Sequence, residues 1–159
     1  AFRLRLTKHP GRMKRFLDET FFEFNKDWDA LEGKIEREVE DFERATEALV
    51  AGFGDDVARK PGGRLFNRAI FDFLAFYAHD SEVQRLLNDN SEEVRELYHE
   101  VLADSAVLSA VERDTAGVPN TVGRLAAWGN ALNRRFDLDL NVPQIIEADG
   151  AQRIALAAD

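Results

Sequence analysis

Apolar side chains recur at steps of three and four residues through most of this chain. The first series is Met13, Phe16, Leu17, Thr20, Phe21 and Phe24, and the second is Trp28, Leu31, Ile35, Val39, Phe42, Ala45, Thr46, Leu49 and Phe53. This spacing gathers apolar side chains on one face of an α-helix, whereas a half-buried strand alternates every second residue. The pattern therefore predicts an all-α fold.

Glycine, proline and capping residues divide the pattern into separate helices. Pro10 and Gly11 precede the first helix, Asp27 is a candidate N-cap for the second, and Asn120 is a candidate cap for the last. The third is apolar almost all round, which predicts a central position. The expected helices cover residues 12–24, 27–53, 66–77, 81–87, 91–102, 105–113 and 120–136.

The last part of the chain changes character after Phe136. Pro143 interrupts it, residues 144–146 have the pattern of a short strand, and Asp149 is placed to cap a terminal helix. We therefore expect an irregular bundle of about six or seven helices. Residues 1–136 form the helical domain, and residues 137–159 form an extension that packs on it or leads to a further domain.

Composition excludes several classes of function. At 159 residues the chain fits one domain, and it contains no cysteine. Disulfides, thiolate catalysis and cysteine-bound metals are therefore excluded, which fits a reducing cytoplasm. No apolar run approaches the roughly 18 residues of a membrane span. The formal charge of −9 disfavours general binding to nucleic acid. We expect no cofactor, since no phosphate loop or zinc motif is present.

Two groups of basic residues are candidates for binding an anion. Arg12, Lys14 and Arg15 form a basic patch that fits a phosphate or an acidic partner, although a solvated helix face explains them better. Arg64 and Arg68 follow the Gly62-Gly63 turn at a helix start, where free N–H groups also attract anions. The alternative is that the glycines only make the turn and that Arg68 pairs with Asp72.

A metal site is the weakest candidate. Glu96 and His99 lie one helical turn apart, as the ligands of di-iron bundles do. Such a bundle needs a second copy of this pair and two further carboxylates, and the sequence has one copy. A surface pair is the preferred interpretation.

Several stretches, taken in order, resemble the helical C-terminal region of the GmrS-like family, also catalogued as domain of unknown function 262. They are residues 12–20, an acidic helix ending at 51–54, residues 63–72 with Phe66-Asn67-Arg68-Ala69-Ile70-Phe71-Asp72 as the strongest element, and residues 115–124. The resemblance covers roughly residues 3–135. It directs attention to Arg64, Asn67, Arg68, Asp72 and Arg124 as candidate anion- or partner-binding residues. A buried Asn67 or Arg68 would organise the loop at 115–121.

The resemblance implies that a ParB/sulfiredoxin-like domain precedes this region in a bacterial restriction or anti-phage protein. In that family, NTP hydrolysis and DNA cleavage belong to the ParB-like domain, through an Asp-Gly-Gln-Gln-Arg motif, and to a His-Asn-His-type nuclease domain in some members. The segment Asp149-Gly150-Ala151-Gln152-Arg153 departs from that motif at Ala151 and is treated as a chance match.

These observations lead to three hypotheses of function, of which the first is preferred and the other two are alternatives. The first is a non-catalytic helical module of a modification-dependent restriction or anti-phage protein, which packs against a nuclease or NTPase domain and contacts DNA through the parent protein. The second is a DNA- or nucleotide-sensing module that uses Arg12, Lys14, Arg15, Arg64 and Arg68 on one face. The third is a metal-dependent helical enzyme built on Glu96 and His99.

Overall fold

The computed structural model describes residues 2–148 and 150–156, and these residues are mostly α-helical. The helices are α1 (Phe2–Arg5), α2 (Met13–Lys26), α3 (Trp28–Phe53), α4 (Arg68–Ala78), α5 (Ser81–Asp89), α6 (Ser91–Ala103), α7 (Ser105–Glu112) and α8 (Val118–Phe136), with short 3-10 helices η1 (Leu6–Lys8) and η2 (Gly54–Asp56). The predicted fold class is confirmed. No helix in the described part of the chain combines the length and apolar character that a membrane crossing requires.

Helix α4 forms the centre of the body, as its apolar sequence predicts. All its residues from Phe73 to Ala78 are buried, and α3, α5, α7 and α8 pack around it. The Phe73 ring lies 5.9 Å from the Trp128 ring of α8, centroid to centroid. Burial of this apolar surface is the main stabilising contribution to the bundle.

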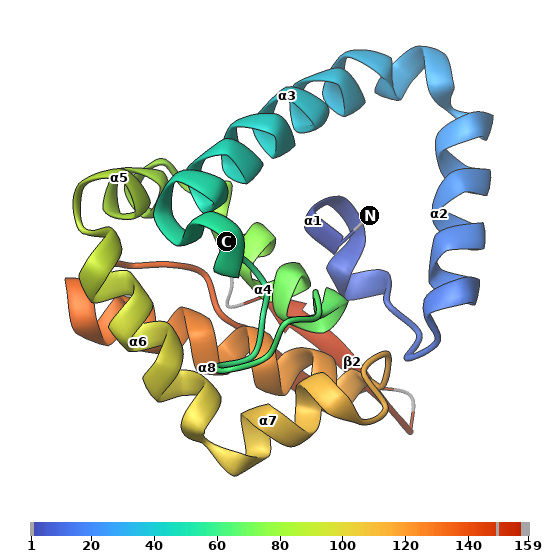
Figure 1. Cartoon of the computed structure of the whole chain (residues 1–159). Coiled ribbons are helices and arrows are strands. Elements are labelled where there is room, and N and C mark those ends of the chain that lie inside the picture. The colour runs from blue at the N-terminus through green and yellow to red at the C-terminus, as the bar shows by residue number, and fades with distance from the viewer. Residues whose placement is uncertain (1, 149, 157–159) are drawn as a thin grey trace.

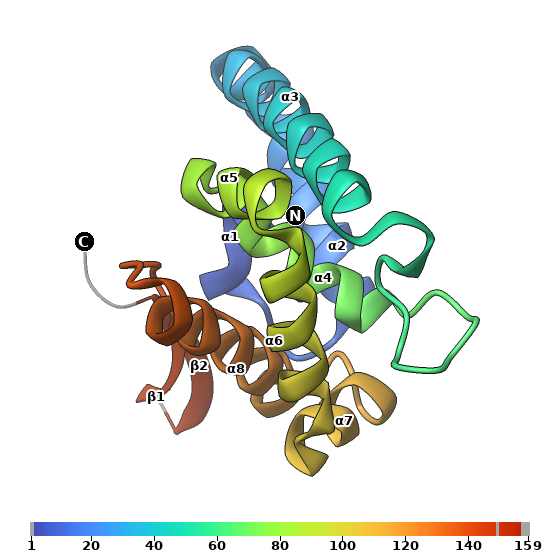
Figure 2. The ribbon, with the colours of Figure 1, turned by 60° about the vertical axis from the view of Figure 1, so that its left-hand side comes forward.

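Helix α2 and the first half of α3 stand away from this body as an arm (Figure 1), and Figure 2 shows α3 projecting from it. We define the arm as α2 plus residues 28–44 of α3. Buried residues in α3 begin only at Ala45, and α2 buries only Phe16 and Thr20. The arm therefore leaves much of the apolar stripe that its sequence predicts open to solvent.

The C-terminal segment is a β-hairpin, so the predicted terminal helix is wrong. Strand β1 (Pro143–Ala148) pairs antiparallel with β2 (Ala151–Leu156), with Ile145 opposite Ile154. Gly150 has a φ of +72°, which suits the tight turn between the strands. Both strands lie against α8, and Ile154 is buried in the core, which favours pairing over helix. Asp149, the predicted cap, lies outside the described residues.

The start of α8 also differs from the prediction. The helix begins at Val118 after Gly117, with Pro119 in its first turn, so Asn120 is not its cap. Instead, Asn120 Nδ2 donates to the carbonyl oxygens of Arg113 and Asp114. Proline suits this position because the first N–H groups of a helix have no partner within it. Asp27 lies at the predicted boundary, as the single residue between α2 and α3, but its side chain makes no capping hydrogen bond to α3.

Candidate functional site

A buried arginine joins three parts of the fold. Arg124 of α8 is 1% exposed. Its Nη1 donates to the Thr115 carbonyl oxygen at 2.7 Å, and its Nη2 lies 3.5 Å from Asp72 Oδ2 of α4. Its Nε has no hydrogen-bond partner among the described residues. Arg124 therefore ties α8 to α4 and to the loop that precedes α8, residues 113–117.

The electrostatics of the Arg124–Asp72 pair show a high desolvation cost. Burial raises the pKa of the Asp72 carboxyl above its ordinary value, although the nearby Arg124 charge opposes this shift. Burial also lowers the pKa of Arg124, and Asp72 opposes that shift in turn. In both groups desolvation outweighs the attraction between the charges. The pair is thus held together by the surrounding packing more than by its own attraction.

His9 also holds loop 113–117, although it is far away in the sequence and was not among the predicted site residues. Its Nε2 donates to the Ala116 carbonyl oxygen at 2.7 Å, while the ring packs between Phe2 and Phe16. His9 is 4% exposed, and its Nδ1 has no partner among the described residues. Burial is the largest cause of a lowered His9 pKa, and the Arg124 charge contributes. His9 is therefore a neutral anchor that fastens the start of the arm to the body.

We expect the stability of the protein to fall in mild acid because His9 must remain neutral. Its folded pKa lies below the unfolded value of 6.5, so the unfolded chain binds the proton more readily. The stability that neutral His9 contributes is complete above about pH 6.5 and is lost as the pH falls through the folded pKa. Urea unfolding at pH 7.5 and pH 5.5 measures this loss.

The control for this experiment is His9→Gln, which retains a donor but does not titrate. The variant should lose less stability than the wild type between the two pH values. His99→Gln, at an exposed position, should behave like the wild type. An equal pH dependence in wild type and His9→Gln would show that His9 does not carry the effect.

Asn67 links the start of α4 to the end of α7. Its Oδ1 accepts a hydrogen bond from the Ile70 backbone N–H at 3.0 Å, which caps α4, and its Nδ2 donates to the Val111 carbonyl oxygen at 3.0 Å. Asn67 is half-buried. Its partner on α7 lies just before loop 113–117, so Asn67 organises the helix that leads into the loop.

Replacing Asn67 with alanine should lower the free energy of unfolding by about 2 kcal/mol, since both the cap and the link to Val111 are lost. Asn67→Asp keeps the cap oxygen and loses the donor, so it should cost less than the alanine variant. Urea titration of both variants measures the difference. Equal losses in the two variants would mean that the cap contributes nothing.

The other predicted basic residues are not gathered around Arg124. Arg64 and Arg68 are exposed, and neither forms an ion pair within 4.0 Å among the described residues. Asp72 pairs with Arg124 and not with Arg68. On α2, Lys14 pairs with Asp18 at 2.5 Å and Arg15 with Glu19 at 2.6 Å, while Arg12 precedes the helix and is exposed. The charges of the basic patch are thus partly met by acids one turn along the same helix.

Glu96 and His99 lie exposed on α6. Glu96 lines an open, acidic hollow beside Asp89, Glu92 and Glu93, and the His99 ring contacts Tyr98. Within residues 2–148 and 150–156, no three His, Asp or Glu side chains lie together in a way that would hold a metal ion. The geometry adds no ligand to the predicted pair.

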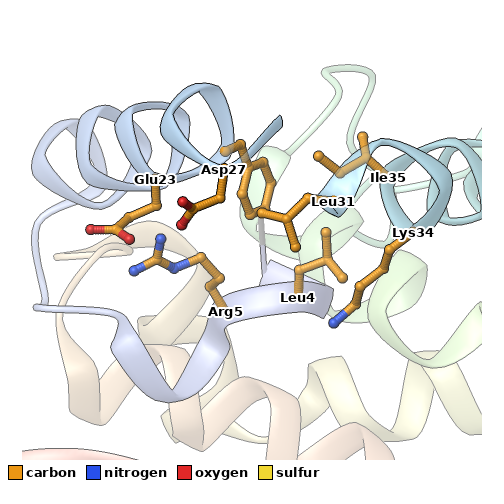
Figure 3. Close-up of a pocket in the computed structure, with 8 residues that line it drawn as sticks. Leu4, Arg5, Glu23, Asp27, Leu31, Lys34 and Ile35 are labelled. Carbon is orange, nitrogen blue, oxygen red and sulfur yellow. The ribbon is translucent and has the colours of Figure 1, made fainter. Parts of the chain in front are cut away.

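A small cleft lies where α1 folds against the arm, and the sequence analysis did not predict it. Its volume is about 220 Å³, and it is lined by Leu4, Arg5, Glu23, Phe24, Asp27, Leu31, Lys34 and Ile35. Figure 3 shows the Arg5 side chain pointing toward Glu23 and Asp27, with Leu4, Leu31 and Ile35 forming an apolar wall. The cleft has room for an apolar side chain beneath a charged rim.

Comparisons with protein-family models, curated proteins and solved structures found no match to this chain. The function is therefore argued from the residues and the geometry described above.

Proposed function

We propose that this chain is a non-catalytic helical interaction module of a cytoplasmic, modification-dependent restriction or anti-phage protein, where it packs against a nuclease or NTPase domain. The observation that carries the interaction role is the arm. Its exposed large apolar side chains are Phe21 (62%), Phe22 (68%), Trp28 (42%), Val39 (52%) and Phe42 (42%). Surface of this kind, gathered on one projecting element, is typical of a protein–protein contact.

The positions of the polar candidates also favour a structural role for them. Arg124, Asp72 and Asn67 are engaged in joining α4, α7, α8 and loop 113–117. These contacts stabilise the body from which the arm projects. The identity of the parent protein rests on the family resemblance of residues 12–20, 63–72 and 115–124, with a ParB-like domain of the same protein as the expected partner.

The sensing alternative has less support from the geometry. A phosphate site needs basic side chains that converge and are free to bind. Here Lys14 and Arg15 already pair with acids, and Arg124 is buried against a carbonyl oxygen. Arg12, Arg64 and Arg68 are the basic candidates that stay exposed without an ion pair in the described part of the chain.

The test is to assay this chain alone, and the longest product of its gene, for cleavage of modified and unmodified DNA and for NTP hydrolysis. We expect both activities in the longer product and neither in this chain. Robust activity of this chain alone would overturn the non-catalytic role. A longest product without either activity, or one that leaves its host unprotected against phage, would overturn the proposed parent.

A further inference from the structure

Six acidic side chains follow one line along α3. They are Asp29, Glu32, Glu36, Glu40, Glu43 and Glu47, and all are exposed. Their spacing of three and four residues places them on one side of the helix. We call this set the acidic line.

The acidic line borders the exposed part of the apolar stripe. Trp28, Val39, Phe42 and Val50 are each between 42% and 52% exposed, and the helical period places Val39 and Val50 on the side of the stripe next to the acids. A hydrogen bond of 3.1 Å from Trp28 Nε1 to Glu32 Oε1 joins the two rows directly. The face that they form runs from Trp28 to Val50, roughly 33 Å at 1.5 Å per residue.

The carboxylates of the acidic line have no ion-pair partner in the described part of the chain. None of them forms an ion pair within 4.0 Å, and the ion pair within α3 joins Arg44 and Asp41. The basic residues of α3 are Lys34, Arg37 and Arg44. The helical period places Lys34 on the opposite side, and it places Arg37 and Arg44 beside the line, one turn from Glu40, where neither pairs with a member of the line. Like charges one turn apart repel each other, so the helix keeps an unfavourable arrangement that a basic partner would relieve.

We propose that this face of α3 binds a basic amphipathic α-helix of another protein domain. The partner helix lays its apolar side on Trp28, Val39, Val50 and the exposed part of Phe42, whose ring also contacts Phe71 and His79. It sets lysine or arginine side chains against the acidic line. This inference deepens the proposed function, because it names the chemistry of the surface that the interaction module uses.

Charge complementarity selects this partner over the others. The acidic line repels the phosphates of nucleic acids and of anionic lipids. A second copy of this chain fits less well, because each copy has a formal charge of −9. The other flank of α3 also offers no basic line, since Lys34 lies there with Glu38 and Asp41.

The experiment uses a designed helical peptide of about 22 residues with leucine on one face and lysine beside it, a length that spans the face. A second peptide carries glutamate in place of lysine, and a third has the lysine peptide's composition without the amphipathic spacing. Fluorescence anisotropy with the whole chain at low and high salt should show binding of the lysine peptide only, and salt should weaken it.

Matched variants assign the binding to α3. Replacing Glu36, Glu40, Glu43 and Glu47 with glutamine, which has a similar helix propensity, should weaken binding at least about tenfold. The control makes the same change at the exposed residues Glu82, Glu92, Glu96 and Glu147 and should change binding less than about twofold. Val39→Ser with Val50→Ser should also weaken binding about fivefold or more.

Equal weakening by the two glutamine variants would overturn the proposal, since it would mean a general attraction of the acidic chain for lysine. No binding of the lysine peptide, or equal binding of the glutamate peptide, would also overturn it. Sedimentation equilibrium that shows a dimer dissociated by the serine variant would assign the face to a second copy instead. None of these results depends on the activity assays, so the inference and the proposed function fail separately.

Discussion

Replacing Arg124 with methionine is expected to lower the free energy of unfolding by about 3 kcal/mol. The change removes a guanidinium that is 1% exposed, and it leaves Asp72 without its ion-pair partner. The Thr115 carbonyl oxygen loses its donor at 2.7 Å and keeps only the longer hydrogen bond of 3.4 Å from Thr121 Oγ1. Methionine fills a similar volume, so the loss is electrostatic and not a cavity effect. Urea unfolding measured against the wild type at pH 7 gives the value.

The companion variant replaces Asp72 with leucine in the Arg124→Met background. Desolvation outweighs attraction in this pair, so an apolar replacement of both charges should recover most of the lost stability. A double variant as unstable as Arg124→Met would show instead that the hydrogen bond to Thr115 is the dominant contact. The Arg124–Asp72 interaction would then contribute little.

Replacing Gly129 with alanine should destabilise the protein by about 2 kcal/mol, although alanine favours helix formation. A Cβ at this position would overlap the Oη and Cζ atoms of Tyr77, which is buried in the central helix α4. Close packing of α8 on α4 therefore requires a glycine. Thermal and urea unfolding measure the effect.

Gly123, also in α8, provides the matched control. It is exposed, and no heavy atom lies within 4 Å of a Cβ added there, so Gly123→Ala should stabilise the protein by about 1 kcal/mol. Adding Tyr77→Phe to Gly129→Ala removes the overlapping Oη, which has no hydrogen-bond partner among the described residues, and should restore part of the stability. Equal effects of alanine at positions 123 and 129 would contradict the packing argument.

The helices could be predicted because their signal is local. Periods of three and four residues marked α2 to α8 within a few residues of their bounds. The strand predicted at 144–146 is confirmed as part of β1, but its partner β2 was missed, since each strand has only six residues and their pairing depends on residues beyond the turn. The periodicity of an apolar stripe also does not show whether other residues pack on it. Phe21, Trp28 and Val39 belong to predicted apolar faces, yet they are exposed.

The buried polar contacts could be predicted only in part, because they join residues far apart in sequence. His9 and the Ala116 carbonyl are separated by 107 positions, and nothing near His9 indicates that loop. Arg124 and Asp72 were identified through the family resemblance, and neither their pairing nor its cost was visible in the sequence. Asn67 was also identified through the resemblance, inside the expected helix 66–77, and its role as the cap of α4 was not predicted, although an asparagine before an apolar helix is a common cap.

The continuity of α3 determines how the arm can respond to a load. A single helix of 26 residues runs from the arm into the centre of the body, with no break along its length. Its far end is wedged among α4, α5 and α6. Because α3 is one continuous helix, we expect a force applied near Trp28 to be transmitted to the packing around Leu49 and Phe53, since no hinge lies between them.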